Sequence, residues 1–87
     1  MTKGHLPTPG AVTVYATGWC PFCTRLRRNL DDLGVDYDLI DIDTDTQAAA
    51  FVEHVNGGNR TVPTVLFADG GTLTNPIAEA VQARATR

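Results

Sequence analysis

Two cysteines, Cys20 and Cys23, stand where an apolar segment gives way to an amphipathic one, and this junction constrains the fold more than any other feature. Residues 11–16 are apolar, β-branched and aromatic, which is typical of a buried strand. Beyond the cysteines, leucines recur at helical spacing as far as Gly34, and Pro21 occupies the favoured first position of a helix. A strand that leads directly into a helix begins a β-α-β unit, so we expect the cysteines at the turn between the two.

The rest of the chain continues this alternation. Apolar and acidic residues alternate between Val35 and Ile42, which predicts a second strand with one solvent-facing side or at a sheet edge. Strands separated by helices pair in parallel through right-handed crossovers, and a hairpin turn at residues 69–71 adds antiparallel pairing. The prediction is an α/β fold in the order β-α-β-α-β-β-α, a mixed four-stranded sheet flanked by three helices.

Local signals predict where these elements end. Thr44 and Gln47 have the spacing of a capping box before the second helix, which Asn56 and the two glycines after it should terminate. Asn75 is predicted to cap the last helix, with Pro76 at its first position. That helix is expected to run through Ile77, Ala80, Val81 and Arg84. Strands are expected at residues 11–16, 35–42, 62–67 and 72–74, and helices at 21–33, 45–55 and 76–84.

Eighty-seven residues suffice for one domain, because two separate cores do not fit in a chain this short. Residues 1–10 contain two prolines and two glycines and are expected to form a flexible tail before a domain at 11–87. The net charge of −3 gives no reason to expect a nucleic-acid partner, and no apolar run approaches the roughly 20 residues that span a bilayer. The tail also lacks the apolar core of a signal peptide, so we expect a cytoplasmic protein.

In a reducing cytoplasm a structural disulfide would not persist, so the two cysteines are metal ligands, redox-active thiols or core residues. A closed zinc site needs four ligands, and only His5 and His54 could complete it, with His5 in the tail. A core role alone would explain neither Trp19 before the pair nor its place at the start of a helix. The position therefore favours a redox-active dithiol that binds no metal.

The two sulfurs should differ in reactivity. Cys20 is placed at the helix N-terminus, where unpaired backbone N–H groups and the helix dipole favour a thiolate. Cysteines in such motifs have pKa values of about 3.5 to 7.5, against about 8.5 for a free thiol. Arg25 and Arg27 could add to this effect. Cys23, one turn further in, should be the more buried thiol, so an exposed attacking sulfur and a buried resolving one are expected, as dithiol exchange requires.

A second motif precedes the third strand, at Thr61-Val62-Pro63. A proline at the entrance of a core strand normally weakens the strand, so we interpret Pro63 as a cis-proline in a tight turn beside the dithiol, against the alternative of a trans proline at a strand start. The backbone of Val62 would then be free to pair with an extended substrate. Arg60 is either a surface cation or a substrate contact.

Together these residues resemble the glutaredoxin family, over residues 12 to about 83, and so imply its thioredoxin-like fold. The similarity rests on Trp19-Cys20-Pro21-Phe22-Cys23, on residues 61–65 and on Asp69-Gly70. Within the family, residues 55–65, 67–70 and 73–76 look most like the actinobacterial mycoredoxins. The resemblance implies Cys20 as the attacking thiolate, Cys23 as the resolving thiol and Pro63 as the cis-proline. The implied substrate contacts are Trp19, Pro21, Phe22, Arg60, Thr61, Val62, Pro63, Thr74 and Asn75.

One departure from the glutathione-using members bears on the substrate. Those proteins carry a Gly-Gly pair and an acidic residue at the start of the last helix, which hold the charged γ-glutamyl end of glutathione. Here the same place has Thr74-Asn75-Pro76. Mycothiol carries its cysteine on an amino sugar and inositol, which hydroxyl and amide groups suit better, although the two residues also serve as helix capping.

The resemblance thus implies an enzyme that reduces mixed disulfides between mycothiol and proteins. Mycothiol would be its co-substrate, an NADPH-dependent mycothione reductase would recharge it, and it would be a monomer with no tightly bound cofactor. One alternative is a thioredoxin-like electron donor recharged by a thioredoxin reductase. Another is a dimer that carries a [2Fe–2S] cluster through one cysteine of each subunit, which the rigid Pro21 after Cys20 disfavours.

Overall fold

The computed structural model describes residues 6–86 and confirms the predicted element order. His5 and the other residues before Leu6, which belong to the predicted tail, lie outside the described part. The elements are β1 (Val12–Ala16), α1 (Pro21–Leu33), β2 (Tyr37–Asp41), α2 (Thr46–Val55), β3 (Thr64–Phe67), β4 (Thr72–Thr74) and α3 (Ala78–Ala85).

The four strands form one mixed sheet in the order β2-β1-β3-β4. β1 runs parallel to β2 and antiparallel to β3, and β3 is antiparallel to β4. β2 is an edge strand, as its alternating sequence indicated. In the β1–β3 register Tyr15 lies opposite Thr64, so the segment that leaves β1 and the segment that enters β3 meet at the same end of the sheet. These are the segments that carry the cysteines and Pro63.

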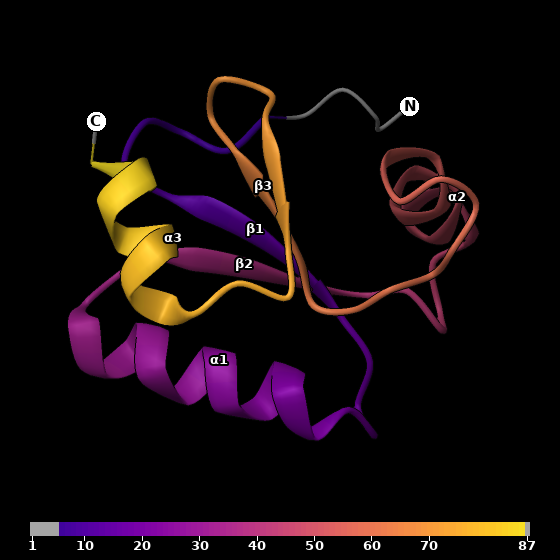
Figure 1. Ribbon diagram of the computed structural model, residues 1–87, viewed down its shortest axis with the longest axis horizontal. Coiled ribbons are helices and arrows are strands. Elements are labelled where there is room, and N and C mark those ends of the chain that lie inside the picture. The colour runs from indigo at the N-terminus through magenta and orange to yellow at the C-terminus, as the bar shows by residue number, and fades with distance from the viewer. Residues whose placement is uncertain (1–5, 87) are drawn as a thin grey trace.

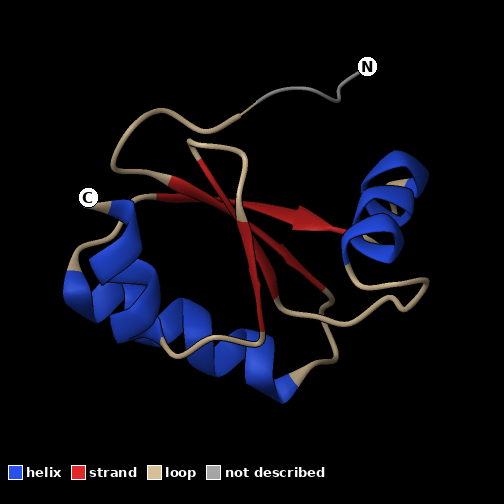
Figure 2. Cartoon of the chain, turned by 45° about the horizontal axis from the view of Figure 1, so that its top comes forward, coloured by secondary structure: helices blue, strands red, loops and turns tan. Residues whose placement is uncertain are grey.

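Alternating side chains send the sheet's two faces into two separate cores. Val12, Val14 and Val65 face α1 and α3, where they pack with Leu26, Leu30 and Val81. Tyr15 and Leu66 face the other way and pack with Ala49 and Val52 of α2. Figures 1 and 2 show α1 and α3 together on one side of the sheet and α2 on the other. None of the helices within residues 6–86 has the length and apolar character needed to cross a membrane.

β2 and β3 each begin two residues later than predicted, and the hydrogen bonding of the backbone explains both starts. The N–H of Val35 donates to the carbonyl of Leu30 at 3.0 Å, which closes the end of α1 around the left-handed Gly34 (φ 72°). Val35 therefore belongs to the helix terminus, and β2 begins at Tyr37. The third strand begins at Thr64, because the Val62–Pro63 peptide is cis and a proline has no N–H to give to the ladder.

The predicted capping box of α2 is wrong by one residue. Asp45 is the N-cap, and its carboxylate accepts a hydrogen bond from the N–H of Ala48 at 3.0 Å. A carboxylate satisfies the helix N-terminus and its dipole better than a hydroxyl, which explains why Asp45 takes this place. Thr44 instead donates its hydroxyl to the carbonyl of Asp41 at 3.3 Å.

The predicted start of the last helix is also wrong. An N-cap needs extended backbone, but Asn75 has φ 50° and its N–H donates to the carbonyl of Pro63 at 2.7 Å. Ile77 is the N-cap, without a side-chain bond, and is exposed. α3 begins at Ala78, so Pro76 lies before the helix, and the buried face of α3 consists of Ala78 and Val81.

Candidate active site

Cys20 is the N-cap of α1, at the end of the turn that follows β1. Its backbone is extended (φ −89°, ψ 113°), and its sulfur accepts a hydrogen bond from the N–H of Cys23 at 3.3 Å. The carbonyl of Cys20 accepts a bond from the N–H of Thr24 at 3.2 Å, which begins the helix. The sulfur thus lies where backbone donors and the positive end of the helix dipole stabilise negative charge.

Cys23 has the opposite character. It is only 1% exposed, and both cysteines are free thiols. Burial, and then the hydrogen bond between its thiol and the Cys20 sulfur, raises the pKa of Cys23 to about 12. The charge of Arg27 lowers the pKa of Cys23, but less than burial raises it. A protonated thiol therefore stands directly behind the sulfur at the helix start.

The predicted exposure of Cys20 is wrong, because this residue is only 4% accessible. The Val62 carbonyl lies 3.9 Å from its sulfur, and Val62 packs against the cluster to which both cysteines belong. The exposed groups at this end are the aromatic neighbours instead: Trp19 is 72% and Phe22 53% accessible. A substrate would meet these two rings beside a sulfur that is nearly covered.

The loop before β3 reaches the dithiol as the sequence suggested. The Val62–Pro63 peptide is cis, Pro63 is buried, and the Val62 carbonyl faces the Cys20 sulfur. The N–H of Asn75 binds the Pro63 carbonyl at 2.7 Å, so the segment after β4 holds this loop from the other side. Segments more than 40 residues apart in the chain thus come together at one end of the sheet (Figure 1).

Asn56 connects three of these segments, a role that sequence reasoning missed. Its amide donates to the Val52 carbonyl at 2.9 Å and to the Thr64 hydroxyl at 3.0 Å, and its carbonyl oxygen accepts from the Thr74 hydroxyl. Thr64 in turn donates to the carbonyl of Thr61 at 2.8 Å. An asparagine before two glycines signals the end of a helix, and nothing local marks it as the centre of a network.

The aromatic neighbours of the dithiol have charged partners. The indole N–H of Trp19 donates to the carboxylate of Asp43 at 2.9 Å, a contact between the segment that follows β1 and the segment that follows β2. The Arg25 guanidinium lies 5.9 Å from the Phe22 ring centroid. Arg25 is therefore placed over an aromatic face, and of the two arginines it is Arg27 whose charge acts on a cysteine.

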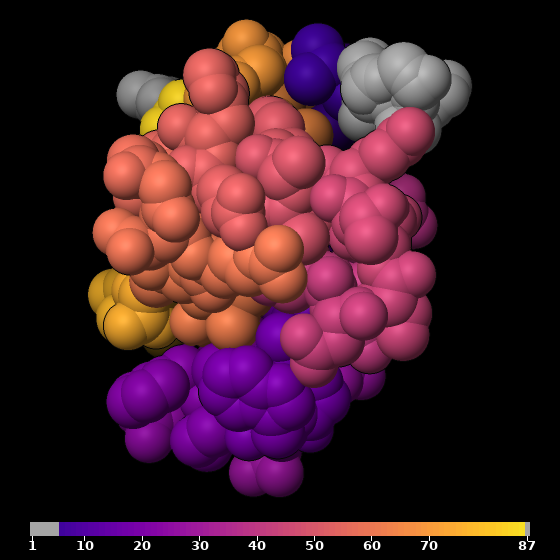
Figure 3. Space-filling view, turned by 90° about the vertical axis from the view of Figure 1, so that its right-hand side faces the viewer, coloured from indigo at the N-terminus to yellow at the C-terminus, as the bar shows by residue number. Residues whose placement is uncertain are grey.

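Arg60 is exposed and forms an ion pair with Glu53 of α2. The sequence left two alternatives for this side chain, a surface cation and a substrate contact, and did not predict the ion pair with Glu53. Figure 3 shows the face on which the segments around residues 41–46 and 57–61 meet the start of α1. Among the described residues no three His, Cys, Asp or Glu side chains gather as a metal site would require, and His54 is exposed on α2.

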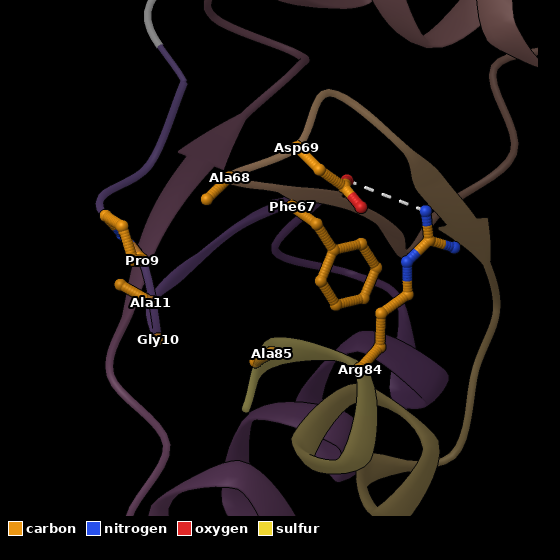
Figure 4. A pocket seen from close by; sticks show the side chains of 8 residues that line it. All are labelled: Pro9, Gly10, Ala11, Phe67, Ala68, Asp69, Arg84 and Ala85. Carbon is orange, nitrogen blue, oxygen red and sulfur yellow. Dashed lines mark ion pairs between the residues drawn. The ribbon is translucent and has the colours of Figure 1, made fainter. Parts of the chain in front are cut away.

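A cavity of about 180 Å³ lies at the opposite end of the sheet, before β1 and after β3. Arg84 lines it, with its guanidinium 4.7 Å from the Phe67 ring centroid and 3.6 Å from the Asp69 carboxylate (Figure 4). Phe67 and Asp69, the two residues that contact this guanidinium, thus both belong to the β3–β4 hairpin. The cavity is lined by Pro9, Gly10, Ala11, Phe67, Ala68, Asp69, Arg84 and Ala85.

Comparisons with known proteins agree with this geometry. A family model described as Glutaredoxin matches residues 12–71. Mycoredoxin 1 of Corynebacterium glutamicum is 53% identical over 73 residues, which are 84% of this chain and 90% of that protein. A Mycobacterium tuberculosis protein classed as a glutaredoxin is 55% identical over 74 residues, 85% of this chain and 88% of its own. The crystal structure of the glutaredoxin from Methanosarcina mazei Go1 superposes with a TM-score of 0.71 at 24% identity, covering 91% of this chain and 81% of that one, and so shares its fold.

The family match spans well over half of the chain, and the alignments with the two relatives cover most of the length of each relative. The thioredoxin-like glutaredoxin fold that the sequence predicted is confirmed. The chain therefore belongs to the glutaredoxin family and is a thiol–disulfide oxidoreductase.

Proposed function

We propose that this protein reduces mixed disulfides between mycothiol and protein thiols, with Cys20 as the attacking thiolate. The observation that carries the proposal is the Cys20 sulfur at the start of α1, 3.9 Å from the Val62 carbonyl and bonded by the N–H of Cys23. The name and 53% identity of mycoredoxin 1 support mycothiol as the small thiol. We further propose that the enzyme acts as a cytoplasmic monomer without a tightly bound cofactor.

The reaction has two exchanges. The Cys20 thiolate attacks the mycothiol sulfur of the mixed disulfide, which forms a Cys20–mycothiol disulfide and releases the protein as a thiolate that takes a proton from water. A second mycothiol thiolate then attacks the mycothiol sulfur on Cys20. This step forms the disulfide of mycothiol and restores the Cys20 thiolate, and mycothione reductase returns the two electrons from NADPH.

The high pKa of Cys23 supports this order of events. In the reduced protein the Cys23 thiol keeps its proton, partly because it is bonded to the Cys20 sulfur and partly because the charge of Cys20 disfavours a second thiolate beside it. Once Cys20 is in a mixed disulfide, that charge is gone and one cause of the raised pKa disappears. Cys23 is therefore the resolving thiol of a second route, in which it attacks Cys20 and releases the small thiol.

The surroundings supply the contacts. Exposed Trp19 and Phe22, on either side of Cys20 and Pro21, would receive the substrate protein. The backbone of Val62 would pair with an extended thiol substrate, as the sequence suggested, and Thr61 and Pro63 would contact it from either side.

The segment after β4 would meet the sugar. Thr74 gives its hydroxyl proton to Asn56, so its oxygen would act as an acceptor toward mycothiol. The side-chain amide of Asn75 can both donate and accept, while its backbone N–H is bound to Pro63.

A coupled assay tests the proposal. NADPH consumption with a mycothiol-modified protein as substrate should require both mycothiol and mycothione reductase, and Cys20→Ser should abolish it. Turnover with thioredoxin reductase alone, without any small thiol, would replace the proposal by the thioredoxin-like electron donor.

A further inference from the structure

Arg60 belongs to the loop that reaches the Cys20 sulfur. It is two residues before Val62, whose carbonyl faces Cys20, and three before the cis-proline. Its side chain is 63% accessible, so its guanidinium is open to an anionic thiol that approaches this loop. An accessible arginine with five donors is a natural partner for a carboxylate. Taken alone, Arg60 would attract thiols that carry one.

Glu53 is already bound to that guanidinium. The carboxylate of Glu53, in the last turn of α2, accepts a hydrogen bond from Nε of Arg60 and forms the ion pair. Glu53, through this bond and its charge, raises the pKa of Arg60. The carboxylate therefore occupies one side of the fork that would otherwise bind an anion.

Asp43 brings a second negative charge to the same place. Its carboxylate accepts from the Trp19 indole at 2.9 Å, which fixes it beside the residue that precedes Cys20. The charge of Asp43 also raises the pKa of Arg60, but less than Glu53 does. The three charged groups sum to −1; Asp43 is bonded to Trp19, and Arg60 belongs to the loop that leads to the cis-proline.

We infer that Glu53 and Asp43 are specificity-determining residues, which neutralise Arg60 and so select small thiols without a free carboxylate over anionic ones. The inference rests on the proposed use of a small thiol at Cys20. Mycothiol belongs to the selected class, and glutathione, with two carboxylates and one ammonium group, belongs to the rejected class. The rejection is electrostatic, since no side chain has to block the site.

The size of the effect follows from exposed charges in water. Removing one carboxylate several ångströms from an anionic thiol should raise its reactivity about threefold at low ionic strength, and removing both about tenfold. Screening should reduce the gain to less than about twofold in 0.5 M salt. A loss of structure would produce no such salt-dependent gain.

The experiment compares two reductants with the same neutral disulfide, hydroxyethyl disulfide. Glutathione is the anionic probe and 2-mercaptoethanol the uncharged one, and kcat/KM for each is measured with wild type, Glu53→Gln, Asp43→Asn and the double variant. Asparagine at position 43 keeps an oxygen for the Trp19 indole. The ratio of the glutathione value to the 2-mercaptoethanol value should rise about tenfold in the double variant at low salt and fall back in high salt.

Two controls make the result specific. Asp32→Asn removes the same charge at the far end of α1, where the side chain is exposed, and should leave the ratio unchanged. Adding Arg60→Gln to the double variant should lower the ratio about threefold, because it removes the released guanidinium that attracts the anion. An unchanged ratio in the double variant, an equal gain in Asp32→Asn, or a ratio that Arg60→Gln does not lower would each overturn the inference. Mycothiol is absent from this comparison, so failure of the mycothiol proposal would be seen separately, in the coupled assay with mycothione reductase.

Discussion

The two ends of the central sheet each place an arginine beside a carboxylate, and they use the pair differently. At the end that follows β3, the Arg84 side chain is only 25% exposed, stacks on Phe67 and approaches Asp69 within one hairpin. At the end that precedes β3, Arg60 is exposed and pairs with Glu53 of another element. The first pair fills space, and a Cβ on Gly71 would collide with its guanidinium. The second leaves its charges in water beside the dithiol.

The difference shows how a small domain separates stability from reactivity. At the Arg84 end, the guanidinium is largely covered and packs on the Phe67 ring, so substitutions there should change the free energy of unfolding. At the dithiol end, the segments are joined to one another by hydrogen bonds from Asn56, Asn75 and Trp19, and the Cys20 sulfur lies at the start of α1. Substitutions there should change rates more than stability.

The largest effect is expected from Cys20→Ser. A serine hydroxyl is not ionised at neutral pH and cannot exchange with disulfides, so turnover should fall by at least about 10³-fold while the Tm changes little. The matched variant Cys23→Ser should keep activity on mycothiol mixed disulfides, since a second mycothiol can resolve them. Retained turnover in Cys20→Ser would reverse the two roles.

Phe67→Ala tests the opposite end. The ring is buried between the sheet and Arg84, so its loss should cost about 3–5 kcal/mol of unfolding free energy, measured by urea denaturation. The kcat of the folded fraction should stay within about twofold of wild type. If the alanine variant does not fold, the milder Phe67→Leu serves instead. A stable variant with a strongly reduced kcat would break the separation between the two ends.

Asn56→Ala should affect both quantities, because its amide joins the end of α2 to the two segments beside the dithiol. Loss of its bonds to Thr64 and Thr74 should cost about 1–3 kcal/mol and raise KM severalfold. Asn59→Ala, which removes one exposed bond to the Asn56 carbonyl, is the matched control and should cost under about 0.5 kcal/mol. Equal costs in the two variants would deny Asn56 its central place.

The smallest expected effect is a dependence of stability on alkaline pH. The pKa of Cys23 is about 12 in the folded protein, against a usual value of 9.0. The contribution of this thiol is therefore complete below about pH 9 and is lost as pH rises toward 12, because the unfolded chain gives up its proton first. The Tm of the reduced wild type should fall more steeply above pH 9 than that of Cys23→Ala. Burial raises the pKa of Tyr15 in both proteins, so the difference isolates Cys23, and parallel curves would contradict the assignment.

The sequence predicted those parts of the fold that local chemistry decides. Both ends of α1 were correct, because Pro21 and Gly34 each suit the backbone at their own position. The start of α3 was wrong, because Asn75 is held by the Pro63 carbonyl, which no neighbour in sequence reveals. The burial of Cys20 was missed for the same reason, since the Val62 carbonyl that faces it lies 42 residues away.

The polar partners at the dithiol end illustrate the same limit. Trp19 and Arg60 were recognised as candidate contacts, but their partners Asp43 and Glu53 were not, since both carboxylates read as ordinary solvent-facing positions. The topology of the sheet brings them together. The elements could therefore be inferred from the sequence, and the connections among the loops required the structure.

The most direct test of the division of labour between the two cysteines is their order of alkylation. The reduced protein is treated with limiting iodoacetamide at neutral pH, and each cysteine is quantified by peptide mass spectrometry. Cys20 should be modified first, and Cys23 should remain a thiol, because its raised pKa keeps it protonated and it is buried behind the Cys20 sulfur. Modification of Cys23 first, or of both at equal rates, would contradict the assignment of Cys20 as the attacking thiolate.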